Sequence, residues 1–448
     1  MNDPARMPND RVAALAEALE AAPLVEQRGR LVEVVGTTLR VEGLRARIGD
    51  ICEIGRFGGS SRSGLSAEVV GFAGEIAVLT PLGPVRGLAP SDEIVLARSE
   101  PRVPYGDHLL GRVVDSAMQP LDGQGPIAAF PQRALHSAPP SPLERSPIDR
   151  QVETGIRAID ALMPLGQGQR IGIFASAGSG KSSLLAMLAR HAEADAFVIA
   201  LIGERGREVR EFIEDALGEE GLAKAVVVVA TSDRPAKQRV HAAEVATAIA
   251  EGLREDGRHV VLMMDSITRY ARAQREIGLA AGEPPVRRGY PPSLFAELPV
   301  LFERAGTNAR GAITAIYTVL LEDEEGDPVG EEVRSLLDGH IHLNRKLAGA
   351  GHYPAIDVNA SLSRLVGRIA PPEIRAAGAG LRRALARLAD IELLVQMGEY
   401  SPGQDPLADA ALGARGTIED FLRQDLSTAT PLAETTARLR ALSEMLDG

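Results

Sequence analysis

The segment that most constrains the fold is A-S-A-G-S-G-K-S, residues Ala175–Ser182, which joins two stretches of different pattern. The apolar run Ile171–Phe174 before it is typical of a buried strand, and Ser183–Ala192 after it has helical spacing. Gly178 and Gly180 let backbone N–H groups turn inward around phosphate groups, and the N-terminus of the helix adds partial positive charge. The pattern predicts a strand–loop–helix unit that binds the phosphates of a nucleotide.

Individual residues of this loop have expected roles. Lys181 would reach the β- and γ-phosphate oxygens, and the Ser182 hydroxyl would be a ligand of Mg²⁺. The first position is Ala175, where the usual pattern has glycine. A chance glycine-rich turn is the alternative, but the strand and helix on either side favour a nucleotide site. The residues predicted to bind the nucleotide here are Ala175, Ser176, Ala177, Gly178, Ser179, Gly180, Lys181, Ser182 and Ser183.

Two carboxylates follow apolar runs that are typical of buried strands. Asp265 comes directly after Val260–Met264, and Glu204 comes just after Phe197–Ile202. Because ligands of an open α/β sheet bind at the carboxyl ends of its strands, both side chains are expected beside the phosphate loop. Asp265 would hold the Mg²⁺ hydration shell, unless it only caps the next helix. Glu204 would accept a hydrogen bond from water behind the γ-phosphate, unless it forms only a local ion pair with Arg205.

From Thr154 onward, near-continuous apolar runs alternate with stretches of helical spacing. That alternation predicts an α/β fold in which a parallel sheet is covered by helices on both faces. The runs expected to be strands are Arg170–Phe174, Phe197–Ile202, Ala225–Ala230, His259–Met264 and Ile313–Leu320. The stretches expected to be helices are Lys181–Glu193, Glu208–Leu217 and Ala236–Arg254.

The chain on either side of this core has a different pattern. Between Gly29 and Ser99, short runs rich in Val, Ile and Leu predict a small closed β-barrel or a sandwich. After Pro371 the pattern is helical to the end, with breaks at Ser401–Gly403 and near Pro431. The short runs are Leu31–Val35, Leu39–Val41, Ile51–Ile54, Ala67–Phe72, Glu75–Thr80 and Glu93–Leu96.

Domain boundaries follow from these changes of pattern. We predict a helical segment over 1–28, a β-barrel over 29–99, the core with the phosphate loop over 100–370 and a helical domain over 371–448. The apolar stripe in Asn9–Ala22 would either dock a regulator or stalk protein or pack on the barrel. The proline-rich segment Ser137–Pro147 is expected to wrap onto the domain that follows it.

The composition narrows the classes of partner. The 448 residues have a net charge of −12, and only 3% of them are aromatic, which argues against a nucleic-acid partner. Cys52 is the only cysteine, so an intramolecular disulfide and a cysteine zinc cluster are excluded. No apolar run reaches the roughly 18–20 residues of a membrane span, and Met1–Glu17 lacks the pattern of a secretory signal. We expect a soluble, cytoplasmic protein.

Several longer motifs point to one family. They resemble the type III secretion ATPases, which are homologous to the catalytic and non-catalytic subunits of rotary ATP synthases. The resemblance extends from about Gly29 to Gln396. It implies a β-barrel that serves oligomerisation, a RecA-like ATPase domain and C-terminal helices, in that order. The motifs are G-E-R-G-R-E-V-R-E-F-I-E (Gly203–Glu214), T-S-D-R-P (Thr231–Pro235), D-S-I-T-R-Y-A-R-A-Q-R-E-I (Asp265–Ile277) and G-E-P-P-V-R-R-G-Y-P-P-S (Gly282–Ser293).

The resemblance implies roles for residues at matching positions. Glu204 corresponds to the catalytic glutamate of the family. Lys181, Ser182 and Asp265 correspond to its phosphate and Mg²⁺ residues. Arg205 would help to orient that glutamate or the phosphates.

Further residues match the family outside the phosphate site. Arg364 matches the arginine finger that is inserted into the nucleotide site of the neighbouring subunit, although a surface salt bridge is the alternative. Tyr353 matches the residue that stacks on adenine, and Tyr400 is a weaker candidate for the other side of the base; either could instead be a packing residue. His340 and His342 lie on one face of an expected strand with no third ligand nearby in sequence, so we interpret them as structural.

The function implied by the resemblance is ATP hydrolysis with Mg²⁺ by a homohexamer beneath an export gate of the bacterial inner membrane. The enzyme would release chaperones from export substrates and unfold those substrates, in contact with stalk and regulator proteins. Arg287 and Arg288 favour the injectisome branch over the flagellar export ATPases. Three further functions compete with this one: a rotary ATP synthase subunit, an RNA-dependent hexameric helicase and a regulatory subunit without hydrolysis. Glu204 and Arg364 speak against the regulatory subunit.

Overall fold

The computed structural model describes residues 28–55, 65–98, 101–321 and 326–447. The chain divides into two compact units, one up to Glu100 and one from Pro101 onward. The helix predicted over Asn9–Ala22 lies outside the described residues, so it stays a prediction.

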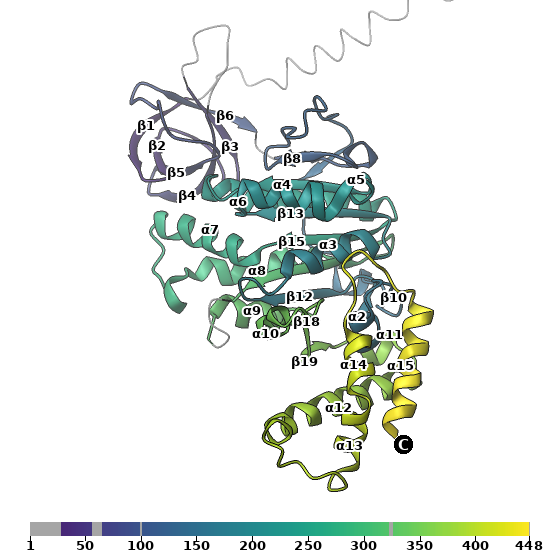
Figure 1. Ribbon diagram of the computed structural model, residues 1–448. Coiled ribbons are helices and arrows are strands. Elements are labelled where there is room, and N and C mark those ends of the chain that lie inside the picture. Colours follow the sequence, from purple (N-terminus) through teal and green to yellow (C-terminus); the bar gives the residue numbers. More distant parts are fainter. Residues whose placement is uncertain (1–27, 56–64, 99–100, 322–325, 448) are drawn as a thin grey trace, which may run out of the picture. The chain divides into compact units, whose positions relative to one another are not determined.

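The first unit is a small closed β-barrel (Figure 1). Its described strands pair in the order β1-β2-β5-β4-β3-β6, and the pairing of β1 with β6 closes the barrel. Leu39, Val41, Leu79 and Ile94 are fully buried in its interior, which explains the predicted apolar runs. Of the two predicted alternatives, the barrel is therefore the correct one. The strands are β1 (Arg28–Val35), β2 (Thr38–Glu42), β3 (Ile51–Gly55), β4 (Leu65–Ala73), β5 (Ile76–Pro81) and β6 (Glu93–Arg98).

The second unit is built around one sheet that contains nine of its described strands. The order is β19-β18-β12-β17-β15-β13-β14-β8, with β16 paired to β17. All neighbours from β18 to β8 are parallel, as predicted for the core, whereas β19 and β16 are antiparallel to their partners. The strands are β8 (Val113–Asp115), β12 (Arg170–Ala175), β13 (Ala196–Ile202), β14 (Ala225–Ala230), β15 (His259–Asp265), β16 (Gly306–Thr307), β17 (Ala312–Leu320), β18 (Gly339–Leu343) and β19 (Ile356–Ser363).

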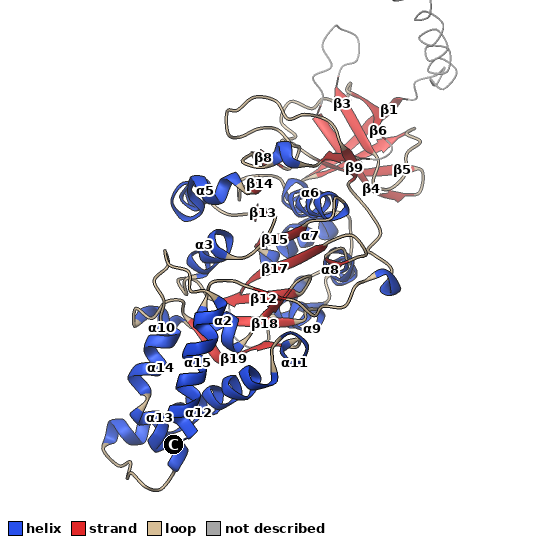
Figure 2. Ribbon diagram, turned by 90° about the vertical axis from the view of Figure 1, so that its right-hand side faces the viewer, coloured by secondary structure: helices blue, strands red, loops and turns tan. Residues whose placement is uncertain are grey.

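Helices cover both faces of this sheet, and its central strands are apolar for that reason. In β13, Phe197, Ile199 and Leu201 join one hydrophobic cluster, and Val198 and Ala200 join the cluster on the other face. Figure 2 shows α3 and α5 on one side of the strands and α6, α7 and α8 on the other. The helices are α2 (Arg157–Leu162), α3 (Lys181–His191), α4 (Gly206–Glu211), α5 (Gly218–Ala223), α6 (Ala236–Glu255), α7 (Ile267–Ala280), α8 (Pro292–Glu303), α9 (Pro328–Leu336), α10 (Arg345–Gly349) and α11 (Val366–Ile369).

Several details of the core differ from the sequence-based expectation, and one is the edge strand β19, which was not predicted. The stretch predicted as one helix, Glu208–Leu217, is helical but changes type. The α-helix α4 ends at Glu211, and a π-helical turn follows directly over Phe212–Leu217. The edge strand β8 was not predicted, because three residues are too few to show a periodic pattern.

The proline-rich segment Ser137–Pro147 lies along the second unit, as predicted. Arg145 donates to the Ala305 carbonyl at 2.9 Å, and the Ser146 hydroxyl donates to the Asn308 carbonyl at 3.0 Å. Polar side chains therefore hold a segment in which proline prevents a long helix or a central strand. The second unit also contains the short elements β7 (Arg102–Pro104), η1 (Asp107–Leu109), β9 (Gln132–Ala134), η2 (Pro142–Glu144), β10 (Gln151–Val152), β11 (Leu165–Gly166) and η4 (Arg287–Gly289).

The end of the chain is helical, as predicted. Its helices are α12 (Pro372–Met397), α13 (Pro406–Gly413), α14 (Arg415–Leu422) and α15 (Leu432–Asp447), with breaks at the predicted positions. Leu439 and Leu442 of α15 are buried in the same hydrophobic cluster as residues of α2 and α3, so the C-terminal helices pack on the core of the second unit. Among the described helices, none combines the length and the apolar character that a membrane crossing requires.

Candidate nucleotide-binding site

The phosphate loop connects the end of β12 to the start of α3. Gly178 and Gly180 have φ values of 78° and 85°, in the left-handed region that glycine adopts without steric cost. The Ser179 hydroxyl donates to the Ser176 carbonyl at 2.8 Å and closes the turn. Gly180 is the N-cap residue of α3, so unpaired N–H groups of the first helical turn are available at this loop. The backbone has the form of an anion-binding turn.

The other predicted loop residues occupy distinct places. Ala175, where the usual pattern has glycine, is the last residue of β12, and its methyl group belongs to the buried hydrophobic cluster. Ala177 is exposed in the loop, and Ser182 and Ser183 lie in the first turn of α3. The departure at Ala175 therefore adds packing to the core.

Lys181 connects the two carboxylates that the sequence singles out. Its ammonium group pairs with the Asp265 carboxylate and lies 3.3 Å from Oε1 of Glu204. All three side chains are at most 12% exposed. The ends of β12, β13 and β15 bring these residues together, since parallel strands place their carboxyl ends at one edge of the sheet.

Burial and charge act in opposite directions on the pKa values of this group. Burial alone would lower the pKa of Lys181, but the charges of Asp265 and Glu204 outweigh it and raise the pKa. Burial raises the pKa of Glu204 above its ordinary value. Lys181 opposes that shift, while the Asp265 charge and a hydrogen bond with Glu208 add to it. Glu204 is therefore a stronger base than an exposed glutamate.

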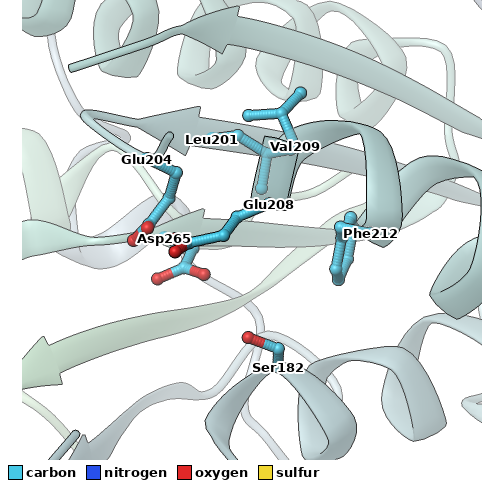
Figure 3. Close-up of a pocket in the computed structure, with 7 residues that line it drawn as sticks. All are labelled: Ser182, Leu201, Glu204, Glu208, Val209, Phe212 and Asp265. Atoms are coloured by element: carbon cyan, nitrogen blue, oxygen red, sulfur yellow. The ribbon is translucent and has the colours of Figure 1, made fainter. Parts of the chain in front are cut away.

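A small pocket opens beside this ion network. Figure 3 shows the carboxylates of Glu204, Glu208 and Asp265 gathered near one another, with the Ser182 hydroxyl across the pocket from them. Carboxylate and hydroxyl oxygens are the donors that Mg²⁺ prefers, so Ser182 and Asp265 fit the predicted metal ligands. The residues that line the pocket are Ser182, Leu201, Glu204, Glu208, Val209, Phe212 and Asp265.

Two polar residues of this site were missed by sequence reasoning. Glu208 lies in the first turn of α4, and its place one turn after Glu204 was a usable signal. Thr318 donates to Oδ1 of Asp265 at 2.7 Å from the neighbouring strand β17. Thr318 gave no signal, because threonine is an ordinary residue in a β-strand.

The two tyrosines predicted for the base pocket have different surroundings. A Cβ atom added at Gly180 would lie 3.0 Å from Cε1 of Tyr353, so the Tyr353 ring lies against the phosphate loop. The Tyr400 hydroxyl donates to Oδ1 of Asp409 at 2.8 Å, among the C-terminal helices. The backbone N–H of Gln424 donates to the Tyr353 carbonyl at 2.8 Å. The role predicted for Tyr400 at the base stays a prediction.

The two predicted arginines are both exposed. Arg205 is the N-cap residue of α4, and its guanidinium group lies 3.6 Å from the Glu208 carboxylate. This local ion pair matches the alternative interpretation of Arg205, although its partner is Glu208 and not Glu204. Arg364 follows β19, and its backbone N–H donates to the Asp338 carbonyl at 2.9 Å. Within the described residues its guanidinium group forms no ion pair, so the surface salt bridge considered for Arg364 is not found.

His340 and His342 pack against an aromatic residue of the core. The His342 ring stacks on Phe174 with centroids 5.1 Å apart, and His340 meets the same ring edge-on at 6.1 Å. Burial, followed by the charge of Arg334, lowers the pKa of His342 to about 4. A neutral, stacked imidazole supports the structural interpretation of the pair.

Three family models match consecutive parts of the chain. The β-barrel domain of the ATP synthase alpha/beta family matches residues 31–96, and the nucleotide-binding domain of that family matches residues 155–363. The C-terminal domain of the type III secretion ATPase EscN matches residues 370–441. The last match separates this chain from the rotary subunits.

Similar proteins agree with these matches. A type 3 secretion system ATPase of Xanthomonas euvesicatoria is 51% identical, over 93% of this chain and 94% of the relative. A flagellum-specific ATP synthase of Pseudomonas aeruginosa is 46% identical, over 95% of each chain. The solved structure of the assembled ATPase EscN from enteropathogenic E. coli has a TM-score of 0.87 at 44% identity, and the match covers 93% of this chain and all of that one. This chain is an ATPase that belongs to the type III secretion ATPase family.

Proposed function

We propose that this ATPase splits Mg²⁺–ATP at the pocket beside Lys181 and uses the energy to drive protein export through a type III secretion apparatus. The observation that supports this most is the meeting of Lys181, Glu204 and Asp265 at the carboxyl edge of the sheet. Lys181 would bind the β- and γ-phosphates from the phosphate loop. Glu204 would accept a proton from the attacking water, a task that its raised pKa suits.

Magnesium is the expected cofactor. Ser182 and Asp265 would hold it, directly or through water, and Thr318 would keep the Asp265 carboxylate in place. A bound Mg²⁺ would neutralise charge on the phosphate oxygens. Glu208 lies close enough to Glu204 to affect its protonation. Arg205, which pairs with Glu208, would influence Glu204 only through that neighbour.

The complete site is proposed to form between copies of the chain. The exposed Arg364 has no ion-pair partner within the described residues and is free to reach the phosphates bound by a neighbouring copy. A guanidinium group there would stabilise charge on the transferring phosphoryl group, which accelerates hydrolysis by roughly 10³–10⁵-fold in enzymes that use such a residue. We propose a homohexameric ring, with the barrel of residues 29–99 as an oligomerisation domain.

The partners are proposed from the relatives. EscN has been solved assembled and in a complex with its central stalk EscO, so a stalk protein is a proposed partner of this chain. Chaperone–substrate complexes and regulators are the other proposed partners. The enzyme would bind them on the cytoplasmic side of the inner membrane, at the export gate. The type 3 secretion system ATPase of Xanthomonas euvesicatoria is 51% identical and the flagellum-specific ATP synthase 46%, so we favour the injectisome branch. The net charge of −12 disfavours an RNA-dependent helicase.

The decisive experiment compares purified wild type with Glu204→Gln and Glu211→Gln. Wild type should release phosphate from ATP only with Mg²⁺, and Glu204→Gln should bind ATP with hardly any turnover. Glu211 lies at the end of α4, a few residues after Glu204, but it is exposed and pairs with Arg207, so its variant should behave as wild type. The absence of Mg²⁺-dependent phosphate release at any degree of self-association would refute the proposal. Stimulation of the rate by RNA would support the helicase function.

A further inference from the structure

The loop after α14 holds the turn that bears Tyr353. The Gln424 N–H donates to the Tyr353 carbonyl at 2.8 Å, and a guanidinium N–H of Arg423 donates to the Gly351 carbonyl at 2.6 Å. On its other side, the Tyr353 ring lies against Gly180 of the phosphate loop. One residue therefore separates the nucleotide site from the C-terminal helices.

The Gln424 side chain is buried and hydrogen-bonded in three directions. It is 4% exposed. Nε2 donates to the carbonyls of Gly155 and Thr428 at 2.7 and 2.8 Å. Oε1 accepts from the backbone N–H of Arg157 at 3.0 Å. An amide with both its donors and its acceptor satisfied has a single orientation, which fixes the backbone that holds Tyr353.

Arg157 fixes the same loop from α2. It is 8% exposed, and its guanidinium group donates to the Phe421 carbonyl at 2.8 Å and to the Thr430 hydroxyl at 3.0 Å. Further bonds reach the carbonyls of Asp420 and Arg423. These carbonyls lie at the C-terminal end of α14, where a helix has unpaired acceptors and partial negative charge. Arg157 therefore caps α14 and joins it to the core.

We infer that Gln424, held by Arg157 and Gly155, is a positioning residue that sets the place of Tyr353 over the phosphate loop. The inference rests on the proposed function, in which Tyr353 stacks on the adenine of ATP. Gln424 acts through Tyr353 and not by contact with the nucleotide. The base-binding half of the site then depends on how the C-terminal helices are packed, whereas the phosphate-binding half does not. By linkage, a bound adenine stabilises that packing.

The test compares ATP with inorganic tripolyphosphate, which binds the phosphate loop but has no base. Gln424→Ala should raise the dissociation constant of ATP about tenfold, the size of one aromatic stacking contact. The dissociation constant of tripolyphosphate should not change, and kcat at saturating ATP should be kept. Gln424→Glu retains the size and the acceptor but loses both donors, and it should show the same selective loss if the alanine variant does not fold. Arg415→Gln, at an exposed position of the preceding helix α14, is the control that should leave both affinities unchanged.

A double-mutant cycle separates positioning from general stability. In a Tyr353→Ala background, Gln424→Ala should have no further effect on ATP affinity, because the residue through which it acts is gone. An equal loss in both backgrounds, or an equal loss for ATP and tripolyphosphate, would overturn the inference. If wild type hydrolyses ATP normally, either of these two outcomes would overturn the inference about Gln424 but leave the proposed function intact. Failure of wild type to hydrolyse ATP would instead refute the proposed function itself.

Discussion

The hydroxyl of Thr318 donates a 2.7 Å hydrogen bond to Oδ1 of Asp265 from the adjacent strand. Both residues are buried, and Asp265 also pairs with Lys181. Thr318→Val keeps the volume of the side chain but removes the donor, so the carboxylate is held less firmly. The variant should fold and should need about fivefold more Mg²⁺ for half-maximal ATP hydrolysis, a change in the range of one lost hydrogen bond. Phosphate release titrated with Mg²⁺ at fixed ATP measures this.

Thr314 provides the control on the same strand. It is also buried, and its hydroxyl accepts from the Gly168 N–H at 2.9 Å and bonds to the His259 ring at 2.8 Å, away from the phosphate loop. Thr314→Val should lower thermal stability without changing the Mg²⁺ requirement. Identical Mg²⁺ titrations for wild type and Thr318→Val would contradict a role for the Thr318 hydroxyl.

Arg364→Ala should bind ATP normally and lose most hydrolysis, since the guanidinium group acts on a neighbouring copy in the proposed mechanism. Lys181→Ala should lose phosphate affinity and activity but retain Arg364. Mixing the two inactive proteins should restore part of the activity, because some interfaces combine an intact loop with an intact arginine. The measurement is the phosphate release rate against total protein concentration.

The control for this mixture is the double variant Lys181→Ala/Arg364→Ala. Mixed with Arg364→Ala, it offers no interface with both parts intact, so the rate should stay at the level of the single variants. Equal rates in the two mixtures at high concentration would exclude a shared site.

The pKa of Glu204 predicts the acid side of the pH–rate profile. Burial, the Asp265 charge and the hydrogen bond with Glu208 raise this pKa above the ordinary value of 4.5, against the effect of Lys181. A general base acts in its deprotonated form, so kcat/KM should fall with acid at a higher pH than an ordinary glutamate would give. Glu208→Gln replaces the partner carboxyl with an amide that can donate to Glu204. The acid limb should therefore move to lower pH.

Glu211→Gln is the matched control for this profile, since Glu211 is an exposed glutamate of the same helix. Its acid limb should coincide with that of wild type. An unchanged limb in Glu208→Gln would show that the two carboxyl groups do not interact.

Asp122 predicts a pH-dependent part of the stability near β8. Hydrogen bonds from Arg112, at 2.7 and 3.1 Å, lower the pKa of Asp122 to about 2, against burial and with help from backbone N–H groups. A carboxyl group with a lowered pKa in the folded state stabilises above its unfolded pKa, and this contribution disappears as the pH falls from about 4 to about 2. Asp122→Asn should lower Tm by about 2 °C at pH 7 and by progressively less below pH 4. Asp390→Asn, at an exposed ion pair, should leave Tm unchanged at either pH.

Sequence patterns predicted the parts of the structure that depend on local order. Apolar runs such as Ala225–Ala230 are strands because each residue is buried on one face of the sheet or the other, and that burial leaves a direct trace in the sequence. The phosphate loop was equally accessible, since its glycines and Lys181 are consecutive. The role of Thr318 could not be predicted from the sequence, because one hydroxyl in an apolar strand does not reveal which neighbouring residue it contacts.

The largest gap concerns the surroundings of Tyr353. Arg423 and Gly351 are 72 positions apart, and Gln424 and Gly155 are 269 apart. No periodic pattern relates such positions, so sequence reasoning did not connect Gln424 with Tyr353, and the role of Tyr400 in this pocket stays a prediction. Contacts between distant segments depend on how helices dock, which local propensity does not specify.

The network of Lys181 with Glu204 and Asp265 has a consequence for the order of events at the pocket. Lys181 pairs with both Glu204 and Asp265, so free phosphate would compete with these carboxylates for the lysine, and a free metal ion would compete with the lysine for Asp265. A metal–nucleotide complex brings both replacement partners at once. When the metal–nucleotide complex binds, phosphate would replace the carboxylates at Lys181 while the metal replaces Lys181 at Asp265. Neither Lys181 nor Asp265 would then lose an ion-pair partner without gaining another, which favours binding of the complex over binding of free phosphate or free metal.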